Sequence, residues 1–329
     1  MREIVSSDYS IWIGENSLSK LNVKTYSKVA ILVDENTKIN CLEKIPKIDK
    51  SIIIEIQSGE ENKTLKTCNH IWKQLTKHKF DRDSLLINLG GGIIGDIGGF
   101  CASSYKRGIN FIHIPTTLLA MTDASIGGKL GIDFNNIKNQ IGFFANPKSV
   151  IINPTFLETL SKKELESGFS EVVKHALISD INLWEMIKNN DFKELNLEEI
   201  ITYSVNLKNK IILTDPKEKR ERKKLNFGHT FGHAIESYYL NNGNPILHGE
   251  AVFMGMILES EISNISDLEK KEIKNYILSN FKLPNKPKKK ELLKYLKNDK
   301  KNRNNKISFT LLNGIGNCTT DNLLTEDEL

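Results

Sequence analysis

Short runs of β-branched and other apolar residues recur through the first half of the chain. They predict strands over residues 29–33, 51–56, 84–89, 110–114 and 150–152. Between the second and third runs, one face of a helix is predicted by apolar residues at helical spacing, namely Leu65, Cys68, Ile71, Trp72 and Leu75. Strands that alternate with helices are typical of βαβ units in a parallel sheet. The pattern therefore predicts an α/β domain.

The pattern changes after about Pro154. From there to Lys297 nearly every window is apolar at a helical period, and the β-rich alternation almost disappears. A chain of 329 residues is also long enough for two domains. We therefore predict an α/β parallel-sheet domain over residues 1–154 and an all-helical domain over residues 155–329.

Composition narrows the class of protein. With 39% hydrophobic and 26% charged residues, the chain lies within the range of soluble globular proteins. The N-terminus lacks the features of a secretory signal, and no run of about 18 apolar residues occurs, so we predict a cytoplasmic protein that does not enter a membrane. The four cysteines are far apart and are predicted to be reduced thiols.

The net charge of +5 is unevenly distributed along the chain. Residues 270–306 hold fourteen Lys or Arg residues against three acidic ones. The basic residues alternate with Ile, Leu and Tyr, as they do in amphipathic helices that turn a basic face to solvent. We interpret this stretch as a solvated face and predict no nucleic-acid partner.

A glycine-rich turn follows the predicted strand over residues 84–89. Gly90, Gly92 and Gly95 match the G-x-G-x-x-G pattern, in which backbone N–H groups and a helix N-terminus approach a pyrophosphate. The acidic residue that usually reads the ribose about 20 positions later is absent. From these residues alone, a tight turn without a ligand remains an alternative.

Three histidines lie close together in the sequence. His229 and His233 are four residues apart, so they share one helix face with Glu236, and His248 begins a second apolar segment. Neutral imidazoles in this arrangement can bind zinc, whereas Thr230 occupies the position of a zinc protease's glutamate. Half-buried, hydrogen-bonded rings are the alternative interpretation.

A charged pair lies within an apolar segment, SGFSEVVKHALI. Glu171 and Lys174 are one helical turn apart, which is the spacing of an ordinary surface ion pair. Their neighbours are apolar, so we expect the pair to face a polar cavity. The segment between the glycine turn and this helix, PTTLLAMTDASIGGKLGIDFNNIKNQIG, is rich in Thr, Asp, Lys, Asn and Gly, a composition that suits an anionic ligand.

Taken together, these segments resemble the 3-dehydroquinate synthase family. The resemblance extends from about Asp34 to Gly316. It rests on seven blocks in the family's order, namely GGGIIGDIGGF, YKRGI, PTTLLAMTDASIGGK, KNQIG, SGFSEVVKHALI, LNFGHTFGHAIE and HGEAVFMGM. Seven ordered blocks are far more specific than any one of them.

The resemblance implies that the N-terminal domain is Rossmann-like and binds NAD. The positions that match the family's cofactor site are Asp34, Asn36, Glu60, Lys63, Gly92, Ile93, Ile94, Gly95, Asp96, Thr116, Thr117, Lys129, Lys138, Phe156, Leu157, Glu158 and Thr159. This family reads the ribose elsewhere, which accounts for the missing acidic residue after the glycine turn.

The resemblance also implies a catalytic divalent metal, zinc or cobalt in its place, held by Glu171, His229 and His248. His233 is then not a ligand. The positions that match the family's substrate and catalytic site are Arg107, Asp123, Lys129, Asn139, Lys174, Lys208, Arg222, Asn226, His233 and Lys300, or Lys301 in its place. Among them, Arg222 and Lys208 would meet the substrate carboxylate, and Arg107 would reach the phosphate from the second subunit of a homodimer.

The reaction implied by the resemblance converts the sugar phosphate 3-deoxy-D-arabino-heptulosonate 7-phosphate to 3-dehydroquinate and phosphate. It proceeds by transient oxidation with NAD, phosphate elimination, re-reduction and an intramolecular aldol closure. A 2-deoxy-scyllo-inosose synthase on the same scaffold is the nearest alternative, but it would not need a carboxylate receptor. A metal-dependent polyol dehydrogenase shares the fold and is disfavoured by the GHTFGHAIE and PTTLLAMTDASIGGK blocks.

Overall fold

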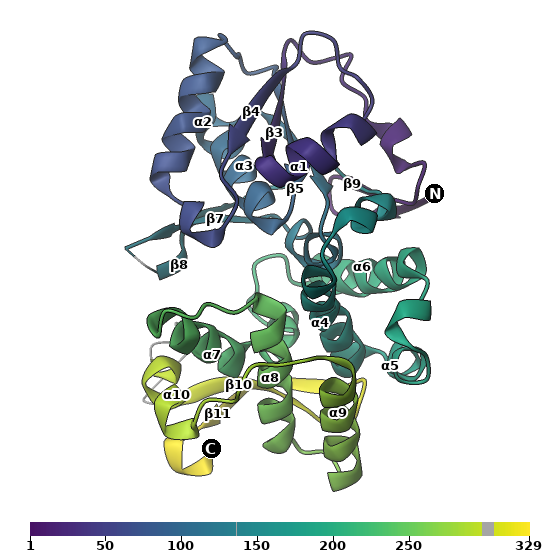
Figure 1. Cartoon of the computed structure of the whole chain (residues 1–329), viewed down its shortest axis with the longest axis vertical. Coiled ribbons are helices and arrows are strands. Elements are labelled where there is room, and N and C mark those ends of the chain that lie inside the picture. The colour runs from purple at the N-terminus through teal and green to yellow at the C-terminus, as the bar shows by residue number, and fades with distance from the viewer. Residues whose placement is uncertain (136, 298–305) are drawn as a thin grey trace. The chain divides into compact units, whose positions relative to one another are not determined.

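The computed structural model describes residues 1–135, 137–297 and 306–329. Contacts within the chain divide it into two compact units, Met1–Ser161 and Lys162–Leu329 (Figure 1). A short 3-10 helix, η6 (Pro154–Thr159), still belongs to the first unit. The division therefore falls several residues after the change of sequence pattern near Pro154.

The first unit is built on a sheet that contains seven strands among the described residues. Their order is β1-β2-β9-β6-β5-β3-β4. The strands are β1 (Arg2–Val5), β2 (Ser10–Ile13), β3 (Val29–Asp34), β4 (Ile52–Ile56), β5 (Leu85–Gly90), β6 (Asn110–Pro115) and β9 (Ser149–Ile152). Neighbouring strands are parallel except β1 and β2. The parallel sheet and its five predicted strands are thus confirmed, with each strand end within one residue of its predicted position.

Helices connect these strands and pack on the sheet. They are α1 (Glu35–Asn40), α2 (Leu65–Lys77) and α3 (Gly92–Ser104), with 3-10 segments η1 (Ser17–Lys20), η2 (Leu42–Lys44), η3 (Glu60–Asn62) and η4 (Tyr105–Arg107). Helix α3 approaches β5 so closely that a Cβ atom at Gly98 would lie 1.9 Å from Oδ1 of Asn88. Glycine is therefore required at this contact, which seats α3 directly on the strand before it.

A β-hairpin in the first unit was not predicted. It consists of β7 (Lys129–Phe134) and β8 (Ile137–Phe144), which pair antiparallel after a π-helical turn, η5 (Ala120–Ala124). Every residue of β8 is exposed. Its sequence therefore lacks the regular alternation of apolar and polar residues that marks a half-buried strand. The hairpin nevertheless packs against α3 through Leu130 and Ile132 of β7, which belong to the hydrophobic core of this unit.

The second unit is mainly helical. Its helices are α4 (Lys162–Ser179), α5 (Ile181–Lys188), α6 (Leu197–Thr214), α7 (His229–Asn241), α8 (His248–Glu261), α9 (Asp267–Asn280) and α10 (Lys289–Leu296), with 3-10 segments η7 (Phe192–Glu194), η8 (Glu221–Asn226) and η9 (Glu326–Glu328). Helix α8 is buried along most of its length and packs against α4, α7 and α9. Its buried position accounts for apolar residues on all sides of the helix, although Glu250 and Glu259 are buried there as well.

The second unit also contains two strands, β10 (Ile307–Leu312) and β11 (Cys318–Leu324), paired as an antiparallel hairpin. The predicted fold class, a Rossmann-like domain followed by a helical domain, is confirmed with this addition to a unit expected to be all-helical. Phe309 and Leu311 of β10 are buried in the same core as Phe231 of α7. The hairpin therefore covers one side of the helices.

The described part of the basic stretch forms α9 and α10. These helices bury Ile273, Ile277, Leu292 and Leu296 and leave most of their lysines exposed, as expected for amphipathic helices. Among the residues that the structure describes, none of the helices is long and apolar enough to cross a membrane.

Candidate active site

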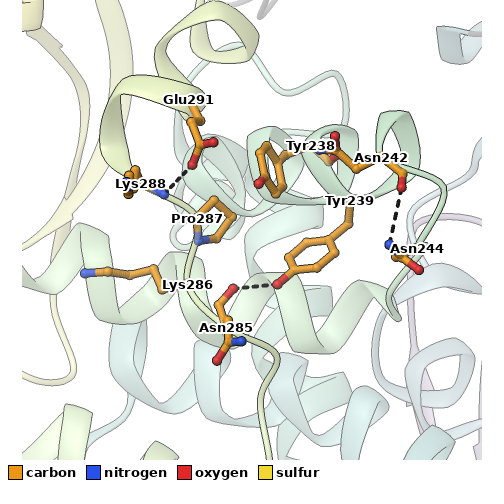
Figure 2. A pocket seen from close by; sticks show the side chains of 9 residues that line it. All are labelled: Tyr238, Tyr239, Asn242, Asn244, Asn285, Lys286, Pro287, Lys288 and Glu291. Atoms are coloured by element: carbon orange, nitrogen blue, oxygen red, sulfur yellow. Dashed lines mark hydrogen bonds between the residues drawn. The ribbon is translucent and has the colours of Figure 1, made fainter.

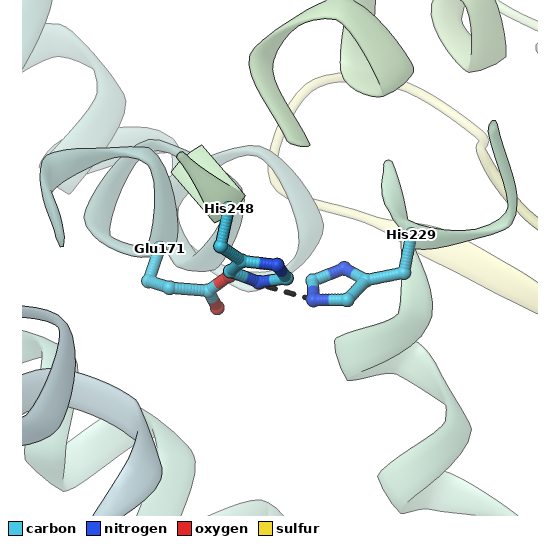
Figure 3. Close-up of side chains that lie close together, drawn as sticks. All are labelled: Glu171, His229 and His248. Atoms are coloured by element: carbon cyan, nitrogen blue, oxygen red, sulfur yellow. Dashed lines mark ion pairs between the residues drawn. The ribbon is translucent and has the colours of Figure 1, made fainter. Parts of the chain in front are cut away.

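A carboxylate and two imidazoles come together in the second unit. Glu171, His229 and His248 each offer one ligand atom, and these atoms lie within 4.8 Å of one another. Figure 3 shows the three side chains pointing toward one another from separate helices. Nε2 of His229 lies 3.5 Å from Oε1 of Glu171, and Nε2 of His248 lies 3.7 Å from the same oxygen.

One of the three residues lies in the middle of a helix, and the other two each begin a helix. Glu171 lies in the middle of α4 and is fully buried. His229 and His248 are the first residues of α7 and α8. Helices α4 and α7 both pack against α8, so the packing brings all three side chains to one place.

Hydrogen bonds fix which nitrogen of each histidine faces the cluster. Nδ1 of His229 lies 3.1 Å from the carbonyl oxygen of Phe227, and Nδ1 of His248 lies 3.3 Å from Oε2 of Glu236. Because a carbonyl or carboxylate oxygen only accepts, both Nδ1 atoms donate. In the neutral form of each ring, Nε2 then carries a lone pair directed toward Glu171, which is the arrangement of a metal-binding histidine with an oxygen partner behind it.

Burial and charge set the protonation of the cluster. Burial opposes ionisation of Glu171, but the charge of Lys174, together with His229 and His248, outweighs it and holds the pKa of Glu171 well below its usual value. Burial, followed by the charge of Lys174, lowers the pKa of His229 well below 6.5. Burial lowers the pKa of His248, but Glu236 and Glu171 outweigh it and raise that pKa to about 10.

The donor set fits a divalent metal. Two ligand atoms that share a tetrahedral zinc at bonds of about 2.0 Å lie roughly 3.3 Å apart, close to the 3.5 and 3.7 Å that separate the imidazole nitrogens from the carboxylate. Oε1 of Glu171, which both Nε2 atoms approach, has no hydrogen-bond partner among the described residues, whereas Oε2 is ion-paired with Lys174. Three protein ligands of this kind leave coordination positions for a substrate, as catalytic zinc sites do.

Lys174 and His233 lie beside this cluster. Lys174 is buried and forms an ion pair with Glu171 across one turn of α4, so the pair does not lie on the surface. The ring centroid of His233 is 5.3 Å from that of His229, with the two rings edge to face. His233 is more exposed than His229 and His248, and it is not in the group of residues that could share a metal.

A second group of predicted site residues lies on α6 and η8, which pack against each other. Lys208 of α6 and Arg222 of η8 are buried. Arg222 donates from Nη1 to the carbonyl oxygen of Pro216 at 2.7 Å, and Asn226 donates to Oε1 of Glu218 at 2.8 Å.

The loop that carries Arg222 is held by Asp215, a residue that the sequence analysis missed. Its carboxylate accepts hydrogen bonds from the backbone N–H groups of Lys219, Arg220 and Arg222. Burial opposes ionisation of Asp215, but these hydrogen bonds outweigh it and lower its pKa. Its position directly after a long helix and before Pro216 was the available sequence signal for such a turn.

Predicted cofactor residues in the first unit lie at the carboxyl edge of the sheet. Strand order reverses between β3 and β5, and dinucleotides bind at such switch points. Asp34 ends β3 and caps α1, accepting from the N–H of Thr37 at 2.7 Å. Gly92–Asp96 form the first turns of α3 after β5, and Thr116 and Thr117 follow β6. Asn36 is exposed on the first turn of α1.

Lys63 is at the centre of a charged cluster at this edge. The buried Nζ lies 2.6 Å from Oδ2 of Asp96 and donates to Oδ1 of Asn139 at 2.6 Å, with Glu60 at 4.0 Å. Burial lowers the pKa of Lys63, but Asp96 and Glu60 outweigh it and raise that pKa. Lys138 lies 3.9 Å from Glu60, so five predicted residues from distant segments meet here.

The other predicted residues are dispersed. Lys129 is exposed at the start of β7, and Asp123 is half-buried in η5. In η6, Phe156 and Leu157 are buried, whereas Glu158 and Thr159 are exposed. Arg107 is exposed in η4 with a positive φ of 69°. Lys300 and Lys301 lie outside the described residues.

A surface pocket of about 390 Å³ lies elsewhere in the second unit. Figure 2 shows its lining, which comes from the end of α7 and the segment before and into α10. Tyr239 donates to the carbonyl oxygen of Asn285 at 2.5 Å across this pocket, and Glu291 accepts from the N–H of Lys288. None of the predicted site residues lines it.

Comparisons with known proteins decide the family. The model described as 3-dehydroquinate synthase N-terminal matches residues 53–167, and that described as 3-dehydroquinate synthase C-terminal matches residues 168–302. The chain belongs to the 3-dehydroquinate synthase family. A 3-dehydroquinate synthase of Parabacteroides distasonis is 39% identical over 92% of this chain and 90% of that protein, and one of Campylobacter concisus is 40% identical over 98% and 95%.

This 3-dehydroquinate synthase family member also resembles solved structures of related enzymes. A 2-deoxy-scyllo-inosose synthase complexed with carbaglucose-6-phosphate, NAD⁺ and Co²⁺ matches with a TM-score of 0.86 and 25% identity, over 99% of this chain and 97% of that one. A 2-epi-5-epi-valiolone synthase from Streptomyces hygroscopicus, solved with NAD⁺ and Zn²⁺, matches with a TM-score of 0.87 and 23% identity, over 100% and 96%. The second likeness concerns the fold alone.

Proposed function

We propose that this chain converts 3-deoxy-D-arabino-heptulosonate 7-phosphate to 3-dehydroquinate and phosphate in the cytoplasm, as a step of the shikimate pathway. The family models and the relatives at 39 and 40% identity support this reaction. The observation that carries the proposal is the convergence of Glu171, His229 and His248, with both imidazole Nε2 atoms facing one carboxylate. The enzyme is then a lyase that breaks a carbon–oxygen bond and releases phosphate.

The proposed cofactors are NAD and a divalent metal, zinc or cobalt. NAD⁺ and Co²⁺ are bound in the solved 2-deoxy-scyllo-inosose synthase, which supports both here. When bound, NAD supplies a reversible hydride acceptor, and the metal supplies a Lewis acid for neighbouring substrate hydroxyls. In this chain Glu171, His229 and His248 would hold the metal, and Lys174 keeps the carboxylate of Glu171 ionised.

The dinucleotide would lie along the carboxyl edge of the first unit. The first turn of α3 would direct its backbone N–H groups at the pyrophosphate, because its N-cap residue is Gly91, which has no side chain to cap them. Asp34, Asn36, Glu60 and Lys63 follow the neighbouring strands β3 and β4, where they can orient the rest of the cofactor. The remaining cofactor positions are Thr116, Thr117, Lys129, Lys138 and Phe156–Thr159.

The chain's other polar residues would bind and orient the substrate. Arg222 suits a carboxylate because its planar guanidinium can donate two parallel hydrogen bonds, with Lys208 as a second positive charge. We assign the phosphate to a separate set and place Asp123 and Lys174 near the reacting carbons. The phosphate set is Lys129, Asn139, Asn226, His233, Lys300 or Lys301, and Arg107 from a second subunit.

The homodimer in this proposal rests on Arg107, which is exposed on a turn of the first unit. Inactive Arg107→Ala and inactive Lys129→Ala subunits are mixed under conditions that exchange subunits. A mixed dimer then contains one site free of both substitutions, so part of the activity returns. If subunits exchange but no activity returns, Arg107 does not serve a neighbouring site.

The proposed reaction is tested by measuring phosphate release from the heptulosonate phosphate. The protein is stripped with a chelator, and then Zn²⁺ or Co²⁺ and NAD⁺ are added singly and together. Rapid release only when both are present supports the proposal. Glucose 6-phosphate serves as the control substrate, because release from it instead would indicate an inosose synthase.

A further inference from the structure

Helix α7 begins at a metal ligand and lacks the usual N-cap. Its N-cap residue is Gly228, which has a left-handed backbone with φ of 78° and no side chain to accept a hydrogen bond. A Cβ atom at this position would lie 2.5 Å from Cγ of Met256, so Ser, Thr or Asp does not fit there. The first N–H groups of α7 must therefore find an acceptor elsewhere.

Glu259 of α8 supplies that acceptor. Its Oε2 accepts from the N–H of Gly228 at 2.6 Å, and its Oε1 accepts from the N–H of Phe231 at 3.0 Å. Glu259 is fully buried. A buried carboxylate is costly unless it is well paired, and here two backbone donors and the positive end of a helix face it. The carboxylate thus replaces the missing cap of α7 from a different helix.

The two hydrogen bonds enclose the metal ligand. His229 lies between Gly228 and Phe231, so Glu259 fixes its backbone on both sides while the carbonyl of Phe227 orients its ring. The contact is also close, because a Cβ atom at Gly255 would lie 1.9 Å from the carbonyl oxygen of Gly228. The backbone of α7 therefore has little room to move against α8.

We infer that Glu259 is a positioning residue for the metal site, acting through the backbone of His229. The inference rests on the proposed function, in which His229 is a ligand. Helix α8 carries His248 at its first residue, and Glu236 of α7 in turn holds the ring of His248. A glutamate of α7, Glu236, thus holds the histidine that begins α8. In the same way, Glu259 of α8 holds the backbone around His229, which begins α7.

A cap that serves stability alone is the competing interpretation, and Asp180 provides a matched control. Asp180 caps α5 in the same unit and also accepts two backbone hydrogen bonds, from Asn182 and Leu183. It does not hold a helix that begins with a candidate ligand. Glu259→Gln replaces one of the two acceptor oxygens with a donor group, so one of the two hydrogen bonds to α7 is lost. Both hydrogen bonds at the α5 cap go to Oδ1 of Asp180, so Asp180→Ala is the variant that breaks this cap.

The test measures metal binding directly in the full-length protein, at a temperature where circular dichroism shows each variant folded. Zn²⁺ affinity is determined by competition with a chelator, and the coordination geometry is followed by the visible absorption of bound Co²⁺. Glu259→Gln is expected to weaken Zn²⁺ binding about 10- to 100-fold, the usual range for residues that orient a ligand, and to change the Co²⁺ spectrum. Asp180→Ala is expected to match the wild type in both.

The outcomes separate this inference from the proposed function. A wild-type protein that binds neither metal would contradict the proposed function itself. Wild-type binding with an unchanged affinity and spectrum in Glu259→Gln would overturn only the role of Glu259. If Glu259→Gln does not fold, Glu259→Asp carries the test, because a side chain one methylene shorter cannot reach both N–H groups. An affinity loss of roughly threefold or more is then expected, and wild-type affinity overturns the inference.

Discussion

The charged residues of the two units are arranged in different ways. At the carboxyl edge of the first unit, Lys63 is already paired with Asp96 and bonded to Asn139. In the second unit, His229 and His248 turn their Nε2 atoms toward the same oxygen of Glu171, and their other nitrogens are held by oxygen partners. In the first arrangement the charged groups are paired with one another, whereas in the second the possible ligand atoms converge on one point.

This difference indicates how each site depends on its side chains. A dinucleotide at a sheet edge is held largely by backbone N–H groups and the helix that follows the glycine turn. A metal site depends on three individual side chains and on what orients them. We therefore expect substitutions of the proposed metal ligands to act on chemistry, and those in the charged cluster of the first unit to act on stability as well as on cofactor binding.

The largest effect is expected from the three proposed metal ligands. Glu171→Gln, His229→Ala and His248→Ala should each lose tightly bound metal and at least about 1,000-fold in activity, because the several kcal/mol supplied by a Lewis acid are lost. His233→Ala is the matched control and should keep its metal. Metal content is measured by elemental analysis after gel filtration. A metal-free His233→Ala together with a fully loaded His248→Ala would show that the ligands are wrongly assigned.

The next effect concerns the ion pair that the buried Lys63 forms in the first unit. Lys63→Met leaves the half-buried carboxylates of Asp96 and Glu60 without their buried cation. The cost is about 1–3 kcal/mol, less than for a fully buried pair because water still reaches the carboxylates. We expect this loss in the free energy of unfolding by urea at pH 7, with metal content unchanged. The double substitution Lys63→Met with Asp96→Asn should recover part of it. An unchanged free energy in Lys63→Met would mean that the cluster does not support the fold.

A pH-dependent effect is expected from His113 of β6. Burial lowers its pKa to about 4 from 6.5, and it lies 3.2 Å from the side-chain nitrogen of Asn88. The unfolded chain therefore takes up a proton before the folded one, so stability is intact above pH 6.5 and falls as the pH drops toward 4. The loss at pH 4 is about 3 kcal/mol.

Urea unfolding between pH 7 and pH 4 measures this loss. His113→Gln should show a smaller fall in stability over this range than the wild type. The exposed His78 provides the control, since His78→Gln should leave the wild-type slope unchanged. Equal slopes in all three proteins would exclude His113 as the source of the acid sensitivity.

Much of the fold followed from sequence patterns, whereas the details of the sites did not. The buried parallel strands were predictable because their apolar runs are continuous and are followed by turns. The hairpin of β7 and β8 was missed because Lys138, Asn139 and Gln140 interrupt any alternation. The hairpin of β10 and β11 was missed in a region that was expected to be helical throughout.

The candidate site shows the same limit. Spacing could place His229 beside His233 on one helix face, but it left open which histidine would lie with Glu171, because that depends on how α4, α7 and α8 pack. The resemblance to the family supplied that set. Glu259 carried no motif, since its role is to bond to backbone groups 28 and 31 residues away.

The central claim is the family reaction, in which NAD is needed but not consumed. The enzyme is incubated with Zn²⁺, an excess of the heptulosonate phosphate, and less NAD⁺ than substrate, while phosphate release and the absorbance of reduced nicotinamide are followed together. Because substrate and products are at the same net redox level, phosphate should greatly exceed the total NAD, and NADH should never exceed the amount of enzyme. Accumulation of one NADH for each phosphate released would identify a dehydrogenase and contradict the account.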